Sequence, residues 1–387
     1  MSDSEKKQSE LEAKLREALG FNPPTAKEAE ALMRKAKGIP MTRAVVQRIV
    51  DQAVRGEMPE PLLAPDYVWL ADVPTAEASE FVFNRNRAGT TKDVPPERWE
   101  EVRRRCERAE TAAQDIVVNM GLSPPIDPFA IAESETPILH VQAKDFGNRF
   151  DGQLEFDKVS REFVMLVNSK YDATWPQKGH HPRTRFSVAH ELGHYFLDHH
   201  RARLIRGGHP HPSHSDFTSD LMFEREADHF ASALLMPLSQ LKDRAMRFSP
   251  GLPAMRGIAD HFGTSLTSAA IRYVSANLAP VVVLKWNPDG FGWKWLSDAA
   301  YAAGIRKTIE QTDLVPRDSA TGRVLAGEAG VGQPIEQGTT AAAWFPFIQH
   351  GSTRNDILTE QAISLGEHGS LTVLFPQGGR FSTAREW

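Results

Sequence analysis

Two helical stretches constrain this 387-residue chain more than any other feature of its sequence. In each, apolar residues recur at intervals of three and four, the pattern of an amphipathic helix. The first covers residues 183–199 and the second about 219–235, where Met236-Pro237 ends it. Their apolar stripes favour an antiparallel pair of packed helices, which would bring the polar residues beside the stripes together. The stripes consist of Phe186, Ala189, Leu192, Gly193, Phe196 and Leu197 in the first helix, and of Phe223, Ala227, Phe230, Ala231 and Leu234 in the second.

The first helix contains the sequence His-Glu-Leu-Gly-His at residues 190–194. On a helix, residues at positions i and i+4 lie on one face, so His190 and His194 can hold one metal ion. Glu191 lies beside the first histidine and can take a proton from a water on that metal, as a general base. This pattern predicts a hydrolytic zinc site with His190 and His194 as ligands and Glu191 as the catalytic residue.

A catalytic zinc site needs a third protein ligand, and two residues compete for that role. His200 gives the spacing His-x3-His-x5-His of the metzincin type. That type requires glycine three residues after the second histidine, where this chain has Leu197, a good helix former.

The alternative third ligand is Glu224, on the second helix, and the sequence favours it. Asp228 lies four residues later on the same helix face and can accept a hydrogen bond from the far nitrogen of a ligating histidine, which fixes its tautomer. Glu226 is the rival carboxylate, but it lies about 200° round the helix from Glu224, so we expect it to face solvent.

The composition limits which residues can bind a metal and which partners the chain can bind. The single cysteine, Cys106, excludes an internal disulfide and a cysteine-rich zinc finger, so a metal must use His, Asp or Glu. Such a set accepts Zn²⁺ and also Mn²⁺. The net charge of −5 gives no reason to expect whole-chain binding to nucleic acid or acidic membranes. The charged N-terminus and the lack of a long apolar run predict a cytoplasmic protein without a membrane span.

The order of helical and extended patterns predicts an α+β fold. We expect a mainly helical zincin-like core with a small sheet at 96–278, a C-terminal β-rich domain at 279–387, and an N-terminal helical or irregular region of unknown role at 1–95. Asp151-Gly152 is a turn signal between the strands of the small sheet. The remaining expectations are helices at 97–120, 125–134, 238–247 and 254–276, and strands at 138–143, 163–169, 281–286, 291–297, 340–347 and 370–376.

The two helices together carry a family resemblance. The segments FSVAHELGHYFLDH at 186–199 and EREADHFASALLMP at 224–237 closely resemble the ImmA/IrrE family of bacterial metallo-endopeptidases. Residues 125–132, the Asp151-Gly152 turn and residues 258–274 extend the resemblance, and 360–376 resembles a C-terminal segment of some members. It implies His190, His194 and Glu224 as ligands and Glu191 as the base.

Members of this family typically cut a helix-turn-helix repressor and so release stress, phage or mobile-element genes. The resemblance therefore implies a protein substrate of that kind. The alternative is a regulatory binding protein that uses the same fold as a platform, with little or no proteolysis. Direct DNA binding by residues 25–56, which could form two helices, is disfavoured because acidic residues are interspersed with the basic ones.

The sequence also contains residues that could reach the site but are expected to have ordinary roles. Three histidines in the loop at 201–218 could act as donors or inhibitory ligands, although a solvent-exposed loop is the favoured interpretation. Tyr195 is expected to pack in the core and not to stabilise an oxyanion. The three loop histidines are His209, His211 and His214.

Overall fold

The computed structural model describes most of the chain from residue 96 onward, in which two compact units can be recognised. The predicted helices within 1–95 and the loop histidines His209, His211 and His214 lie outside the described residues. The described stretches are 96–172, 179–206, 222–305, 315–316, 318–345 and 352–382.

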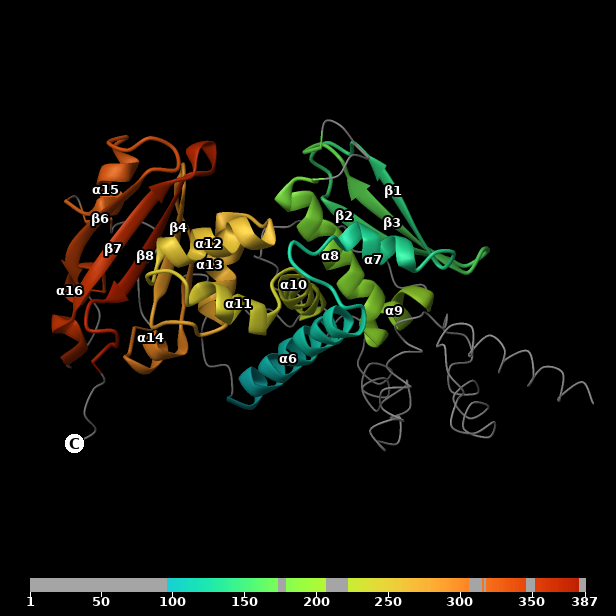
Figure 1. The fold of residues 1–387 in the computed structure, drawn as a ribbon, viewed down its shortest axis with the longest axis horizontal. Helices are drawn as coiled ribbons and strands as arrows, with labels where there is room; N and C mark the ends of the chain where they lie inside the picture. The colour runs from blue at the N-terminus through green and yellow to red at the C-terminus, as the bar shows by residue number, and fades with distance from the viewer. Residues whose placement is uncertain are drawn as a thin grey trace, which may run out of the picture. The chain divides into compact units, whose positions relative to one another are not determined.

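The first unit contains the described part of Glu97–Leu235, a set of helices around a three-stranded sheet (Figure 1). Each predicted helix of this region is present within a few residues of its expected bounds. Its elements are α6 (Pro96–Asn119), α7 (Pro128–Ser134), β1 (Leu139–Lys144), β2 (Gly152–Asp157), β3 (Glu162–Asn168), α8 (Pro182–Phe196), α9 (Asp198–Ile205) and α10 (Met222–Leu235).

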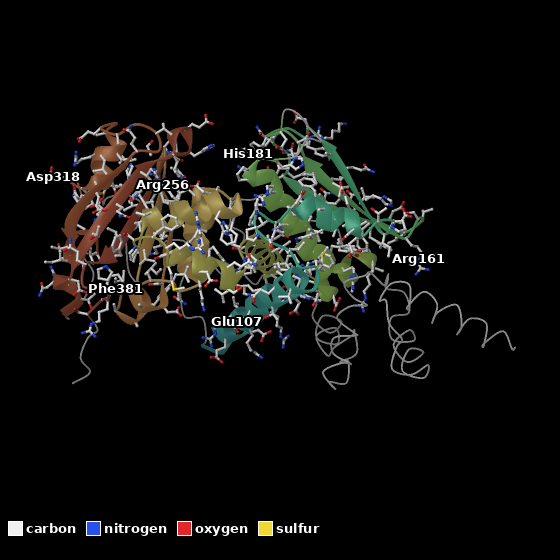
Figure 2. The ribbon with its side chains drawn as sticks, viewed as in Figure 1. Glu107, Arg161, His181, Arg256, Asp318 and Phe381 are labelled. Atoms are coloured by element: carbon white, nitrogen blue, oxygen red, sulfur yellow. The ribbon has the colours of Figure 1, made fainter. Side chains whose placement is uncertain are left out.

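The small sheet has the order β1-β3-β2, with β1 parallel and β2 antiparallel to the central strand. The sequence predicted β1 and β3 but read Asp151-Gly152 as the turn between them. Gly152 instead begins β2, and the tight turn lies after Asp157, where Arg161 has a φ of 62° (Figure 2). The additional strand makes β2 an edge of this sheet, next to α8.

The core of the first unit lies between the sheet and the helices α7, α8 and α10. Phe163 and Met165 of β3 face Tyr195 and Leu192 of α8, and all four are buried. Tyr195 stacks edge-on against Phe163 and donates a hydrogen bond to Glu135 Oε2 at 2.9 Å, which is consistent with the expected packing role.

The second unit contains the described part of Met236–Trp387, built on a five-stranded antiparallel sheet of order β5-β4-β8-β7-β6. Its helices cover both faces of that sheet. The elements are α11 (Leu238–Ala245), α12 (Leu252–Phe262), α13 (Leu266–Ser275), β4 (Val282–Asn287), β5 (Gly290–Leu296), α14 (Asp298–Ala302), α15 (Ala320–Leu325), β6 (Pro334–Thr340), α16 (Ala341–Trp344), β7 (Ile357–Ser364) and β8 (Ser370–Pro376).

Alternation along β4 and β8 separates two cores. Val283 and Val373 face α11, α12 and α13, whereas Val282 and Leu374 face α14 and α16. This sandwich explains why residues 236–278 group with the sheet. The packing of residues 236–278 on the sheet does not show whether they fold with it as one domain. The predicted domain boundary near residue 278 therefore stays a prediction.

Two local predictions in the second unit were wrong, and two of its strands were not predicted. The helix expected at 254–276 is divided at Gly263, which has a left-handed φ of 62°, and Ser265 then caps α13. The strand expected at 340–347 is instead the short helix α16, capped by Thr340. Strands β6 and β7 were not predicted. The α+β fold with a C-terminal sheet is confirmed.

Candidate metal centre

Helix α8 carries the histidine pair and is held in place at both ends. His181 caps its N-terminus by accepting a hydrogen bond from the Arg183 backbone N–H (Figure 2). Arg183 also binds the buried Asp151 carboxylate with two nitrogens, at 3.0 and 2.8 Å, which attaches the start of α8 to the start of β2. The helix ends at Leu197, where the backbone turns to an extended conformation and α9 begins.

Helices α8 and α10 approach closely because Gly193 has no side chain. A Cβ at this position would lie 3.1 Å from Ala227 Cα and 3.2 Å from the Phe230 ring. The predicted helix pair is therefore present, with small residues at its closest point. This approach brings the polar residues of the two helices together.

Three nitrogen and oxygen donors converge between these helices. The Nε2 atoms of His190 and His194 lie 3.1 Å apart. Glu224 presents one carboxylate oxygen to each of them, at 3.2 Å from His190 Nε2 and 3.5 Å from His194 Nε2. The three residues sequence analysis named as ligands thus form one buried cluster that could hold a metal ion.

The donor set fits a tetrahedral metal in both spacing and chemistry. Ligand atoms about 2.0–2.1 Å from a tetrahedral ion are about 3.3 Å from one another, close to the three separations observed here. His190 Nδ1 bonds to Asp228 Oδ1 at 2.9 Å, so this nitrogen donates and leaves a lone pair on Nε2. Lone pairs that face one another and a carboxylate in a buried site favour a cation between them.

The charges around His190 favour a positive charge in the cluster of His190, His194 and Glu224. Burial alone would lower the pKa of His190, but its hydrogen bonds to Asp228 and Glu224, and their charges, outweigh that effect and hold the pKa well above its ordinary value. Burial raises the pKa of Asp228. Asp228 therefore lies where the sequence predicted it, behind a histidine of the cluster.

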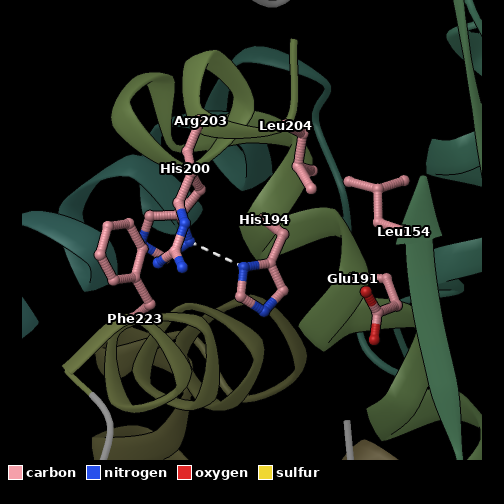
Figure 3. A pocket seen from close by; sticks show the side chains of 7 residues that line it. All are labelled: Leu154, Glu191, His194, His200, Arg203, Leu204 and Phe223. Atoms are coloured by element: carbon pink, nitrogen blue, oxygen red, sulfur yellow. Dashed lines mark hydrogen bonds between the residues drawn. The ribbon is translucent and has the colours of Figure 1, made fainter. Parts of the chain in front are cut away.

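Glu191 lies beside this cluster and against the edge strand. Its side chain is fully buried, and a Cβ on Gly152 would lie 2.8 Å from Glu191 Oε1. Figure 3 shows Glu191 next to the strand that carries Leu154, on the same pocket as His194. The glycine at the start of β2 thus leaves the room that this carboxylate occupies.

The pocket beside the cluster has a volume of about 340 Å³, including space open to solvent. Figure 3 shows His200 and Arg203 of α9 on one side of it, Glu191 of α8 on the other, and His194 between them. The lining residues are Leu154, Glu191, His194, His200, Arg203, Leu204 and Phe223.

The expectation that Glu226 faces solvent was wrong. Only 2% of its surface is exposed, because α6 and α9 cover that face of α10. Arg105 of α6 donates to both oxygens, at 2.8 and 2.7 Å, and His199 and His200 of α9 contact Oε2 at 3.0 and 3.1 Å. Burial alone would raise the pKa of Glu226, but the two histidines hold it well below its ordinary value.

His200 is not a member of the three-donor cluster, although it lies next to it. Its Nδ1 is 2.9 Å from His194 Nδ1, on the side of that ring away from the cluster. Sequence reasoning missed this contact and those of Arg105. The only local sequence signal for the contact between His194 and His200 was their spacing, His194-x5-His200. Sequence analysis considered this spacing as one of metal ligands.

Comparison with known proteins shows what this centre is similar to. Residues 177–273 match the model of the IrrE N-terminal-like domain, Peptidase_M78. No curated protein matches the chain. A solved structure of a Mycobacterium tuberculosis transcriptional regulator is similar over 72% of this chain and 94% of its own length, at 14% identity and a TM-score of 0.45.

Among the described residues, no helix has the length and apolar character needed to cross a bilayer. The matched range includes α8, α10 and every residue of the three-donor cluster. Residues 177–273 therefore resemble the IrrE N-terminal-like domain, and the resemblance of this chain to the ImmA/IrrE family is confirmed.

Proposed function

We propose that this protein is a zinc-dependent endopeptidase, with His190, His194 and Glu224 as the metal ligands and Glu191 as the general base. The observation that carries the proposal is the convergence of donor atoms from three residues, at separations of 3.1 to 3.5 Å, beside a buried glutamate on the same pocket. A peptidase needs these two parts together.

The zinc ion, Glu191 and Asp228 would each have a different role in peptide hydrolysis. A bound zinc ion would act as a Lewis acid that polarises the scissile carbonyl and acidifies water. Glu191 accepts the proton of the attacking water on its carboxylate and returns it to the leaving amine nitrogen. Asp228 holds His190 in the tautomer whose Nε2 lone pair points into the cluster.

The substrate is proposed to be a protein partner, specifically a helix-turn-helix repressor. Family membership supports a regulatory protein as the partner. Among the described strands, β2 pairs only with β3, so its other edge offers backbone groups to an extended peptide beside Glu191. That edge would align a peptide bond with the pocket that Glu191 and His194 line.

Glu191→Gln tests the proposal directly. The amide keeps the size of the side chain and leaves the ligands in place, but it cannot accept a proton. We expect zinc content equal to wild type and a loss of cleavage of about 10²–10⁴-fold. The assay incubates the zinc-loaded full chain with the helix-turn-helix repressor encoded by a neighbouring gene and follows cleavage by mass spectrometry.

Two outcomes would contradict the assignment in different ways. Cleavage by Glu191→Gln at the wild-type rate would exclude Glu191 as the base. A wild-type protein that binds zinc and the repressor but does not cut it would favour the alternative function, a regulatory binding platform.

A further inference from the structure

The histidine His194 has a polar support that differs from that of its neighbour His190. Asp228 contacts His190 directly, at 2.9 Å. Behind His194 lies a second histidine, His200, with Nδ1 atoms 2.9 Å apart, and the carboxylate of Glu226 lies beyond it, at 3.1 Å from His200 Nε2. The contacts therefore form a line from the cluster to a buried carboxylate.

The hydrogen-bond partners assign one protonation pattern along this line. An ionised Glu226 can only accept, so His200 Nε2 donates to it. The neutral ring of His200 then has an acceptor at Nδ1, which requires His194 Nδ1 to be the donor. His194 Nε2 is left with its lone pair facing His190 and Glu224, as a metal ligand requires.

Glu226 is itself held in one orientation. Arg105 fixes the carboxylate by binding its two oxygens in a bidentate manner, at 2.8 and 2.7 Å. His199 contacts only one of these oxygens, at 3.0 Å. His200 and Glu226 are each only 2% exposed, so solvent does not compete for these bonds. A bidentate guanidinium–carboxylate pair is among the most directional polar contacts in proteins.

The same residues do not favour a second metal ion, although His199, His200 and Glu226 lie close enough to hold one. The Arg105 guanidinium occupies both carboxylate oxygens and lies 2.7 Å from the oxygen that both histidines contact. A cation at that oxygen would face this positive charge at close range. Hydrogen bonds explain why His199, His200 and Glu226 lie together, without a metal ion between them.

We propose that His200 and Glu226 are positioning residues, which act through His194 by fixing its tautomer and ring orientation for metal binding. The inference rests on the metal site of the proposed function but not on proteolysis. Its consequence is that zinc affinity depends on a residue beyond hydrogen-bond reach of the metal ligands, Glu226, through His200.

The adjacent histidines provide a matched test. His199 and His200 both contact Glu226 Oε2, but only His200 contacts His194. We expect His200→Leu to weaken Zn²⁺ binding by about 10–100-fold, the usual effect of losing the partner behind a ligand. His199→Leu should stay within about threefold of wild type. Zinc affinity of the full chain is measured by competition with a chromophoric chelator, without peptide.

A second variant and a spectroscopic signal guard against a simple folding defect. Glu226→Gln keeps the side-chain size and should lower zinc affinity in the same direction as His200→Leu. The visible absorption bands of bound Co²⁺ report ligand geometry. They should shift in both variants and stay as in wild type for His199→Leu, with the circular dichroism of the apo proteins unchanged.

Several results would overturn the inference. His200→Leu and Glu226→Gln that bind zinc within twofold of wild type would exclude the relay, as would equal losses in His199→Leu and His200→Leu. Two zinc ions per chain, one of them lost in His199→Leu, would indicate a second metal site instead. Wild-type protein that binds no metal would overturn this inference and the proposed function together, whereas metal binding without cleavage would overturn only the latter.

Discussion

Two buried carboxylates, one in each unit of this protein, have opposite surroundings: Glu360 in the second unit and Glu224 in the first. Glu360 in the second unit accepts hydrogen bonds from the Thr321 backbone N–H and hydroxyl, at 2.7 and 2.8 Å, and from Trp344 Nε1 at 3.2 Å. Every donor is a neutral group. In the first unit, Glu224 instead faces the Nε2 atoms of two histidines whose other nitrogens already have partners.

The network of the second unit is complete within the protein. Thr372 shares a 2.6 Å hydrogen bond with Thr321 and accepts one from Trp286 Nε1 at 3.0 Å, so the donors form a chain that ends at Glu360. A buried carboxylate with such donors stabilises the fold and needs no further ligand. Converging acceptors, as around Glu224, instead indicate a site for a cation.

The largest expected effect is on zinc affinity, which should depend on Glu224 and not on Glu360. Glu224→Ala removes one of three donors, so zinc affinity should fall by more than the roughly 100-fold typical of a residue behind a ligand. Glu360→Ala should leave zinc affinity unchanged. Chelator competition on both variants measures the difference, and a zinc affinity equal in Glu224→Ala and wild type would contradict the ligand assignment.

The next effect concerns Gly152 and the position of the base. A Cβ at this residue would lie 2.8 Å from Glu191 Oε1 and would displace the carboxylate. We expect Gly152→Ala to lower the rate of peptide cleavage by about 10²-fold, as displacements near 1 Å can do, with zinc affinity retained.

Gly338→Ala is the matched control for this substitution. Gly338 also lies in a strand, β6, and a Cβ there would meet only Gln377 Nε2 at 3.7 Å, an ordinary contact. Cleavage rates should be equal in this control and wild type. Gly152→Ala with an unchanged rate would mean that the Glu191 position does not limit catalysis.

The third effect is on stability and should arise in the second unit. Glu360→Ala leaves the buried donors of Thr321 and Trp344 without an acceptor, which costs about 2–4 kcal/mol of unfolding free energy. Glu367→Ala, at an exposed carboxylate of the same unit, should change it by less than about 0.5 kcal/mol. Urea denaturation provides the measurement, and a Glu360→Ala variant as stable as wild type would contradict this role.

The smallest effect, at most about 1.4 kcal/mol per pH unit, is a pH dependence at another face of α10. His229 Nδ1 donates to Glu110 of α6 at 2.8 Å, and the His229 side chain also has a hydrogen bond with Cys106. Burial alone would lower the pKa of His229, but the charges and hydrogen bonds of Cys106 and Glu110 raise it to about 10. The protonated ring therefore stabilises the folded state fully below about pH 6.5, and this contribution is lost as pH rises to about 10.

Denaturation at several pH values checks this sign. Between pH 6.5 and 10 the free energy of unfolding should fall by up to about 1.4 kcal/mol per pH unit from this group in wild type. His229→Gln should make the decline shallower, whereas His368→Gln, on an exposed turn, should not. Identical slopes in all three proteins would show that His229 titrates as an ordinary histidine.

Local sequence patterns predicted the helices that carry the site, because the apolar period and the i, i+4 spacing of Glu224 and Asp228 are properties of one segment. Local patterns did not predict that Glu226 is buried. The helical wheel placed it correctly on a different face from Glu224, but its partner Arg105 lies 121 positions away in the chain. Which face is covered depends on tertiary packing, which no local pattern contains.

The errors in the strands have a related cause. Strand β6 has alternately exposed residues and β2 has a mixed burial pattern, so neither shows the apolar run by which β4 and β8 were predicted. In contrast, Ala341–Trp344 is apolar and was read as a strand, although the Thr340 cap selects a helix. The strand predictions were clearest where burial on both faces of a sheet imposed an apolar run, as in β4 and β8.

Gly193 has a consequence for recognising which members of a family have kept a working centre. The two residues between Glu191 and His194 are usually treated as free, but the second of them sets the distance between α8 and α10. A larger residue there would move Glu224 outward without changing any donor. Searches for active relatives, and designs that borrow this helix pair, should therefore require a small residue at this position as strictly as the histidines themselves.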